Sequence, residues 1–206
     1  MVYFILLFYG TTEMRKFMKR HLFAAIAGAT LLGLATGHAQ DAVLGDKEFY
    51  TQVNIWFEAA KGAPKPIPTT HYHVGEQIPV GSKVTVTSSN AKEIKFSYNG
   101  QNLTIQLMPK HTTVKMDAVK DRMFKKTNPL ESEAFTSLTK EQQAAVKAGQ
   151  VKEGMTKEAV LMSYGYPPEH KTLSTTANFW TYWHNKFTTR TVTFDADGKV
   201  SETKGF

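Results

Sequence analysis

Two histidines in the run Thr-His-Tyr-His, His71 and His73, have the spacing of a metal-ligand pair. Residues two apart on an extended chain point to the same side, so both imidazoles can face one ion. Zinc needs about three or four ligands, and no third ligand follows from spacing. Two ligands do not make a site, and the alternative is a pair of exposed loop side chains. We therefore expect no metal and no other cofactor.

Other catalytic patterns are incomplete. The run Asp195-Ala196-Asp197-Gly198 resembles the start of a calcium loop, but it lacks the downstream bidentate glutamate, and a hairpin turn explains it. The chain has no cysteine and no Gly-x-Ser-x-Gly elbow, and its carboxylates form no glycosidase-like pair. We assign no catalytic residue and do not expect an enzyme. A hydrolase or metalloprotein, motivated by His71 and His73, remains an alternative.

Two groups of residues are candidates for binding. Residues 109–128 contain six Lys/Arg and two Asp, and such a segment can meet anionic headgroups or an acidic protein. The alternative is a solvated linker. In the aromatic run 178–184, Phe179 and Trp183 are the side chains that we expect on an exposed face. The candidate binding residues are Lys110, Lys115, Lys120, Arg122, Lys125, Lys126, Phe179 and Trp183.

The N-terminal residues 1–39 have the pattern of a secretory signal peptide. A basic stretch, 14–20, precedes an apolar run, 22–34, and Gly37-His38-Ala39 is a small-x-small cleavage site. The apolar run is too short to span a bilayer comfortably. Residues 1–13 precede this pattern, and we interpret them as a start assigned too far upstream. We expect a periplasmic or secreted protein with no transmembrane segment after cleavage.

The composition of the mature part limits the classes of partner. The net charge is +7 for all 206 residues, but the part after residue 39 holds 21 Lys/Arg and 17 Asp/Glu, which leaves +4. This surplus is mild, and we expect no nucleic acid partner. Without cysteine there is no lipobox and no disulfide, so we expect a soluble chain that is not lipid-anchored and is held by its core alone.

Residues 40–115 are rich in strand patterns. Residues 49–57 (FYTQVNIWF) form a strand-like run, and residues 83–87 alternate strictly between polar and apolar. Apolar residues also alternate on both sides of Asn99-Gly100, a pair that tolerates the positive φ of a tight hairpin turn. These patterns predict a small β barrel or meander.

The C-terminal part, 139–206, reads as helices followed by strands. Thr139 and Gln142 fit a capping box at the start of a helix that ends near Gly149. Thr156 can cap a second helix, which Gly165 and the following prolines end. Strand patterns follow at 178–184, 188–194 and 199–201. This order predicts two helices covering one face of an antiparallel sheet.

The motifs of this part resemble the BamE (SmpA/OmlA) family. They are Gly154-Met155-Thr156, Gly165-Tyr166-Pro167, Trp180-Thr181-Tyr182, Val192-Thr193-Phe194 and Gly198-Lys199-Val200, in that order. The resemblance implies a two-helix, three-stranded envelope module. The family's namesake belongs to the machinery that assembles outer-membrane barrels, and β-lactamase inhibitory proteins have a related fold. Unlike the namesake, this chain lacks a lipobox cysteine and carries an additional β segment.

The resulting prediction is an α+β protein. It has a signal peptide (1–39), a small β domain (40–115), a basic connector (116–138) and a BamE-like domain (139–206). We expect a non-enzymatic interaction module of the cell envelope. Its expected partner is an envelope protein or anionic lipid headgroups. The alternative is an inhibitor-like or ligand-binding protein that uses the aromatic sheet face.

Overall fold

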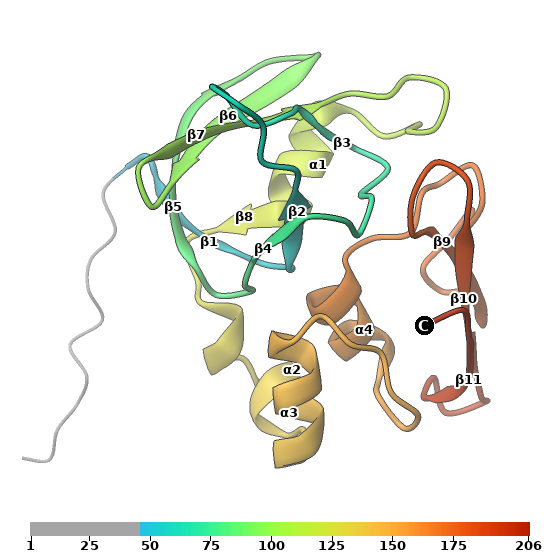
Figure 1. Ribbon diagram of the computed structural model, residues 1–206. Coiled ribbons are helices and arrows are strands. Elements are labelled where there is room, and N and C mark those ends of the chain that lie inside the picture. The colour runs from blue at the N-terminus through green and yellow to red at the C-terminus, as the bar shows by residue number, and fades with distance from the viewer. Residues whose placement is uncertain (1–45) are drawn as a thin grey trace, which may run out of the picture. The chain divides into compact units, whose positions relative to one another are not determined.

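A computed structural model describes residues 46–206 (Figure 1). The predicted signal peptide and the predicted upstream start lie outside the described residues. Helices and several sheets are both present, which confirms the α+β class. The described residues, 46–206, belong to one compact unit, so the described part of the predicted β domain and residues 139–206 lie in the same unit. No helix in this part of the chain is both long enough and apolar enough to cross a membrane.

The N-terminal half is built on a six-stranded sheet. Its strands in spatial order are β3 (Ile67–Pro68), β7 (Gln101–Gln106), β6 (Glu93–Tyr98), β5 (Lys83–Ser89), β1 (Glu48–Thr51) and β8 (Phe124–Lys125). The strands β5, β6 and β7 form the predicted antiparallel meander. The Asn99-Gly100 hairpin is confirmed, since both residues have positive φ, 47° and 79°, and Tyr98 pairs with Gln101.

The run 49–57 is not one strand, and this part of the prediction is wrong. The chain forms β1, leaves the six-stranded sheet, and then pairs β2 (Ile55–Phe57) with β4 (Glu76–Ile78). The break is at Asn54, whose fully buried side chain bonds to backbone groups of three other segments. A buried amide with these partners cannot also sit on a regular strand face.

The segment 116–138, predicted as a connector, consists largely of regular structure. It contains α1 (Met116–Met123), β8, the 3₁₀ helix η1 (Pro129–Glu131) and α2 (Glu133–Thr136). Met116, Val119 and Met123 recur at helical spacing and are buried against the six-stranded sheet. The basic residues of this segment conceal that apolar stripe in the sequence.

The C-terminal part contains α3 (Lys140–Lys147) and α4 (Lys157–Tyr164). Both predicted N-terminal caps are confirmed. Thr139 accepts a bond from the Gln142 amide while Gln142 accepts one from the Thr139 amide, and Thr156 accepts one from the Ala159 amide. Gly165 has φ +78° and ends α4.

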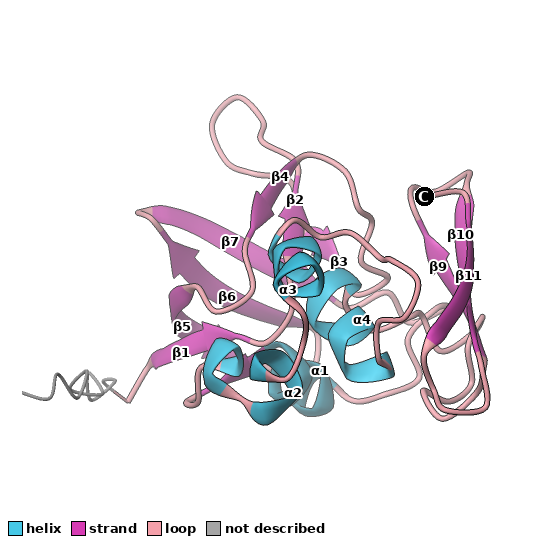
Figure 2. Ribbon diagram, turned by 90° about the horizontal axis from the view of Figure 1, so that it is seen from below, coloured by secondary structure: helices cyan, strands magenta, loops and turns pink. Residues whose placement is uncertain are grey.

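Three antiparallel strands complete the chain: β9 (Phe179–Trp183), β10 (Thr189–Phe194) and β11 (Val200–Lys204), in the order β11-β10-β9. The predicted turn before β11 is present, with Asp195 Oδ1 accepting bonds from the Asp197 and Lys199 amides. Trp180 and Tyr182 are fully buried in a cluster with Val160 of α4. In Figure 2, α4 lies between this sheet and the β2–β4 pair.

Two hydrophobic clusters hold the unit together, and neither stays within one half of the sequence. Val80 belongs to the cluster of α3, α4 and the three-stranded sheet, and Trp56 packs against it. Tyr166, which follows α4, packs in turn against the cluster of the six-stranded sheet. Each half of the sequence therefore contributes side chains to the hydrophobic cluster of the other half.

Candidate functional site

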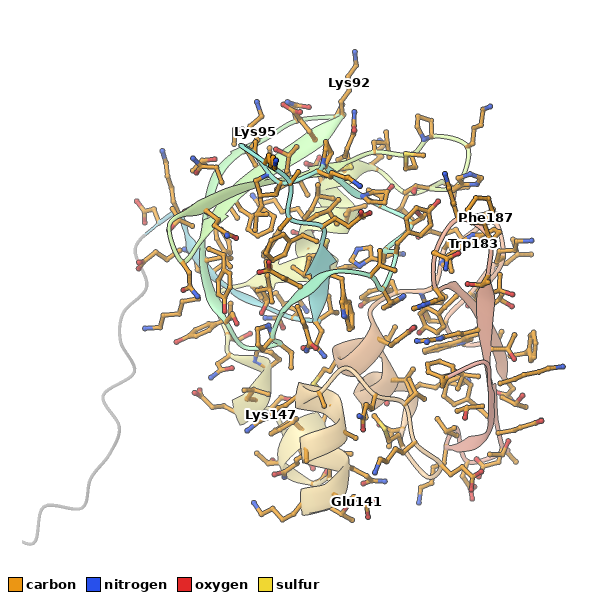
Figure 3. All side chains as sticks on the ribbon, viewed as in Figure 1. Lys92, Lys95, Glu141, Lys147, Trp183 and Phe187 are labelled. Atoms are coloured by element: carbon orange, nitrogen blue, oxygen red, sulfur yellow. The ribbon has the colours of Figure 1, made fainter. Side chains whose placement is uncertain are left out.

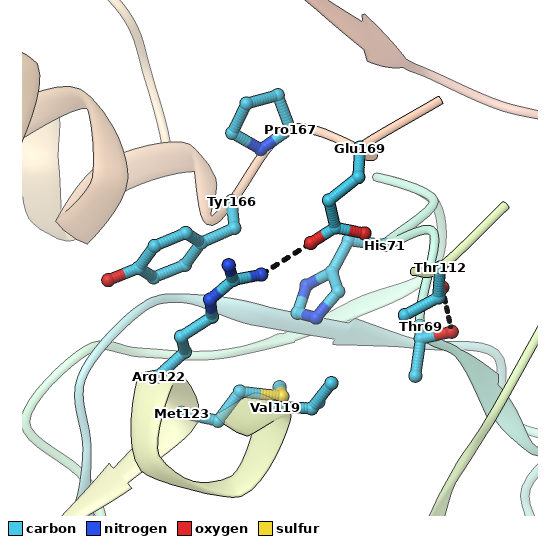
Figure 4. A pocket seen from close by; sticks show the side chains of 9 residues that line it. All are labelled: Thr69, His71, Thr112, Val119, Arg122, Met123, Tyr166, Pro167 and Glu169. Carbon is cyan, nitrogen blue, oxygen red and sulfur yellow. Dashed lines mark hydrogen bonds and ion pairs between the residues drawn. The ribbon is translucent and has the colours of Figure 1, made fainter. Parts of the chain in front are cut away.

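A small cavity lies between α1, the loop after β3 and the chain that follows α4 (Figure 4). Its volume is about 20 Å³, which is room for about one water molecule. The lining residues are Thr69, His71, Thr112, Val119, Arg122, Met123, Tyr166, Pro167 and Glu169. A cavity of this size cannot enclose an organic substrate.

An ion pair forms one wall of the cavity. Arg122 Nη1 lies 2.5 Å from Glu169 Oε1, and the guanidinium lies 4.6 Å from the centre of the Tyr166 ring. Glu169 directly follows the proline pair 167–168 in the chain after α4, and Arg122 lies in the last turn of α1. Of the predicted binding residues, Arg122 is therefore turned inward and engaged with a carboxylate.

His71 faces this cavity and is buried (Figure 4). Its φ is +51°, a left-handed conformation that is uncommon for a residue other than glycine. Burial lowers the pKa of the His71 imidazole from 6.5 to about 4. The Glu169 carboxylate raises this pKa and the Arg122 guanidinium lowers it. At neutral pH the ring is uncharged.

His73 is also buried, but it lies in a different environment. Its ring stacks on Tyr164 with centroids 3.5 Å apart and meets the edge of Trp56 at 4.6 Å. Nδ1 lies 3.0 Å from the Trp183 carbonyl oxygen and Nε2 lies 2.8 Å from that of Tyr164. Burial lowers the pKa of His73 to about 3, against the two backbone contacts that raise it; His71 and Arg190 lower it further.

The interpretation of His71 and His73 as exposed loop side chains is thus wrong, since both are 7% exposed. They do not share a ligand set either, because both ring nitrogens of His73 are used by backbone carbonyls. Within residues 46–206, no group of three or more His, Asp or Glu side chains is placed to hold a metal ion.

The predicted basic residues are spread over several elements rather than gathered at one point. Lys110 is exposed in the loop before α1, Lys115 is exposed at its N-cap, and Lys125 is exposed on β8. The ammonium groups of Lys120 and Lys126 lie 5.5 and 4.2 Å from the centre of the Phe49 ring. Lys126 also donates to the carbonyls of residues 46 and 48.

A surface with several exposed apolar side chains follows β9. Phe179, at the start of β9, is 55% exposed, whereas Trp183, at its end, is half-buried and donates from Nε1 to His170 Nε2 at 3.2 Å. Leu173 is 93% exposed in the loop beside β9, and Phe187 is 80% exposed in the β9–β10 turn. We call these four side chains the β9 surface; Figure 3 labels Trp183 and Phe187 on it.

The sequence prediction named Phe179 and Trp183 as exposed; Phe179 is exposed, whereas Trp183 is half-buried, and Leu173 and Phe187 were not predicted. Both missed residues are single apolar residues among polar ones, in segments 171–178 and 184–188. Such residues are scattered over most protein surfaces. Only the arrangement of the two loops around β9 brings them to the same strand.

The segment that carries the β9 surface is positively charged. Residues 170–194 contain Lys171, Lys186 and Arg190 but no Asp or Glu, and Arg190 is turned to the inner sheet face, where it donates to the Tyr164 hydroxyl. The Lys171 ammonium lies 5.4 Å from the centre of the Trp183 ring, and the Lys186 ammonium lies 4.9 Å from that of Phe187. The apolar side chains are therefore accompanied by cations with no neutralising carboxylate in the same segment.

The outer edge of β9, which faces away from β10, is covered by side chains. Thr172 Oγ1 accepts a bond of 2.9 Å from the Thr181 amide, in the middle of the strand. His73 contacts the Trp183 carbonyl oxygen, two residues further along. The β9 surface thus offers side chains rather than a free row of backbone groups.

No family model, no curated protein and no solved structure matches this chain.

Proposed function

We propose that this chain is a non-enzymatic interaction module of the cell envelope, and that it binds a partner protein through the β9 surface. The observation that carries the proposal is the exposure of Leu173, Phe179 and Phe187 along one strand and the loops beside it. The location of the protein in the cell envelope is proposed from the signal-peptide pattern of residues 1–39.

The energetic argument concerns the water that these side chains contact. Fully burying one Leu or Phe side chain is worth about 1.5–3 kcal/mol. Because Leu173 and Phe187 stay exposed in the folded chain, folding gains almost none of this burial free energy from them. Apolar side chains exposed along one strand and its flanking loops can form a contiguous patch, and contiguous patches mark binding sites. A partner that covers both can gain a few kcal/mol after the costs of association.

The positive charge of the same segment favours an acidic partner surface. Lys171 and Lys186 lie over the aromatic rings of the surface, and residues 170–194 contribute no carboxylate. Charges at the rim of an interface mainly raise the association rate and reject partners of like charge. We therefore propose a partner whose apolar contact patch is bordered by Asp and Glu.

The finer fold assignment, a BamE-like module in residues 139–206, belongs to the same proposal. Two helices precede three antiparallel strands, and the motif residues Trp180, Tyr182, Val192 and Phe194 are buried on the inner sheet face. This order agrees with the family resemblance. An inhibitor-like or ligand-binding role is the second candidate, and it too is restricted to the outer face, because the inner aromatic face is filled.

His71 lines a cavity in which the Arg122–Glu169 ion pair surrounds room for about one water molecule. The hydrolase or metalloprotein alternative has no substrate-sized cavity at His71.

The test is site-specific photo-crosslinking in the native envelope. A benzophenone amino acid replaces Phe187, which is exposed and of similar shape. The matched control carries the same group at Lys92, an exposed residue of the β5–β6 turn (Figure 3). We expect a discrete protein adduct from position 187 only. The double variant Leu173→Ser with Phe179→Ser, crosslinked from 187, should lose that adduct without losing stability.

Two results contradict the proposal. Equal adducts from positions 187 and 92 indicate non-specific collisions. Adducts with lipid alone, together with salt-sensitive binding to anionic vesicles, assign the β9 surface to headgroups instead of a protein.

A further inference from the structure

We propose that the loop between β3 and β4, residues 69–75, is an acid-released strap. It is closed when the rings of His71 and His73 are uncharged, and it opens when these two rings take up protons. This inference concerns the loop alone and does not depend on the proposed function.

The strap is closed by inserting two titratable rings into two different places. His71 fills one side of the cavity beside the Arg122–Glu169 pair. His73 is stacked on Tyr164, with the ring planes 7° apart. Both rings are buried although only one residue separates them in the sequence. Leaving the closed state must therefore expose both rings together.

Three features inside the strap disfavour the closed conformation. His71 holds a positive φ without being glycine. The Thr70 hydroxyl is buried and has no hydrogen-bond partner among the described residues. The two nitrogens of His73 face two carbonyl oxygens, which only accept, whereas a neutral imidazole has one N–H to donate. Each of these features costs free energy in the closed conformation, which lowers the free energy needed to open the strap.

Protonation of His73 has two opposing effects, and burial is the larger one. An imidazolium would donate to both the Tyr164 and Trp183 carbonyls, which favours the charged ring. Complete desolvation of the ring outweighs these two bonds, so the pKa in the closed strap falls to about 3. In water the same ring has a pKa near 6.5. Protons therefore bind the open strap first.

The groups around His71 stabilise its protonated ring less than the two carbonyl oxygens stabilise that of His73. The charged groups that face it are Glu169, from the chain after α4, and Arg122, from α1. The attraction of the carboxylate is opposed by the guanidinium that it pairs with. The titratable groups near His73 are Tyr164 of α4, Tyr182 of β9, Arg190 of β10 and His71 itself. None of these is an acid that is ionised at neutral pH.

Opening also reaches the end of β9. The His73 amide donates to the His184 carbonyl at 3.0 Å, and the His73 ring contacts the carbonyl of Trp183. The strap is therefore fastened to the C-terminal sheet chiefly through His73. Its release frees the backbone beside Trp183.

The experiment is amide hydrogen exchange measured by mass spectrometry on residues 40–206 between pH 7.5 and 5.5, corrected for intrinsic exchange rates. The reporters are the hydrogen-bonded amides of Thr69, His71 and His73. With folded pKa values of about 4 and 3 and an open value near 6.5, each histidine raises the opening constant about tenfold over this range. The wild-type chain should therefore show about a 100-fold rise.

Two variants separate the contributions. His73→Phe keeps a ring against Tyr164 but cannot titrate, and His71→Asn tolerates the left-handed conformation and cannot titrate. Each should reduce the rise to about tenfold. The internal control is the β6–β7 hairpin, whose amides report unfolding of the whole unit and should keep a smaller opening constant than the strap amides at every pH.

The proposal is overturned by an opening constant that does not change with pH, or by stronger protection at pH 5.5, which means that the two carbonyl bonds outweigh burial. Equal opening constants of the strap and the β6–β7 hairpin at both pH values also overturn it, because the whole unit then unfolds together. If His73→Phe does not fold, His71→Asn still decides between these results.

Discussion

Replacing Asn54 by alanine should be among the most destabilising single changes in this chain. The Asn54 side chain is fully buried between four segments. Its Nδ2 donates to the carbonyls of Val146, at 2.7 Å, and Ser163, at 2.8 Å. Its Oδ1 accepts from the Val80 amide at 2.7 Å. One amide group thus joins the turn after β4 to α3 and α4.

The magnitude follows from what alanine leaves behind. The Ser163 carbonyl and the Val80 amide lose their side-chain partner, whereas the Val146 carbonyl keeps a bond from the Gly149 amide. Each unsatisfied buried group costs about 1–3 kcal/mol, so we expect a loss of about 2–6 kcal/mol in the free energy of unfolding. Since domains of this size are stable by only about 5–15 kcal/mol, the variant should be close to unfolding at 37 °C.

The assay is urea denaturation of residues 40–206 at pH 7.5, followed by tryptophan fluorescence and circular dichroism. The matched control is Asn90→Ala, in which the lost Oδ1 contacts are bonds from the exposed Lys92 and Glu93 amides. Water can replace those bonds, so we expect a loss below about 1 kcal/mol. If Asn54→Ala costs no more than Asn90→Ala at equal denaturant slope, the reasoning about buried partners is refuted.

Three further predictions concern backbone conformation, capping and pH. Gly75→Ala should lower the free energy of unfolding by about 3 kcal/mol, because a Cβ there collides with the last carbonyl of β2. The control Gly62→Ala also has a positive φ but lies in open space, and it should lower the free energy of unfolding by about 1 kcal/mol. Urea denaturation of both variants compares the two losses. Thr139→Ala removes half of the capping box and should lower the free energy of unfolding by about 1 kcal/mol. The same urea assay measures this loss, and circular dichroism measures the helix content. Thr139→Ser keeps the capping hydroxyl and should retain the stability. Because the pKa values of His71 and His73 are lowered on folding, the unfolded chain binds more protons below pH 6.5. Stability is therefore complete above that pH and falls by about 1.4 kcal/mol per pH unit per histidine down to their folded values; urea denaturation from pH 7.5 to 5 tests this, and no change in stability would contradict it.

Local signals in the sequence predicted those parts of the fold that depend on neighbouring residues. Asn99-Gly100 has the backbone freedom that a tight turn requires, and the turn forms between the two strands that alternate around it. The caps at Thr139 and Thr156 satisfy amides only three residues away. Such interactions are complete within a short window, so a pattern of residues is sufficient to find them.

Features that depend on distant partners were not visible in the sequence. The strand run 49–57 is divided at Asn54, whose partners lie 92 and 109 residues further along the chain. The burial of His71 and His73 depends in the same way on α1, α4 and β9. The exposure of Leu173 and Phe187 follows from loop paths that no periodicity records.

The covering of the outer edge of β9 has a consequence for self-assembly. An unpaired strand edge is a template on which other chains add strands, and this is a common route to aggregation. Here a threonine hydroxyl occupies the Thr181 amide and the ring of His73 lies against the Trp183 carbonyl. Two side chains thus do the work of a neighbouring strand. A variant without these two side chains would keep its three-stranded sheet, but the exposed edge of β9 could pair with a strand of another chain.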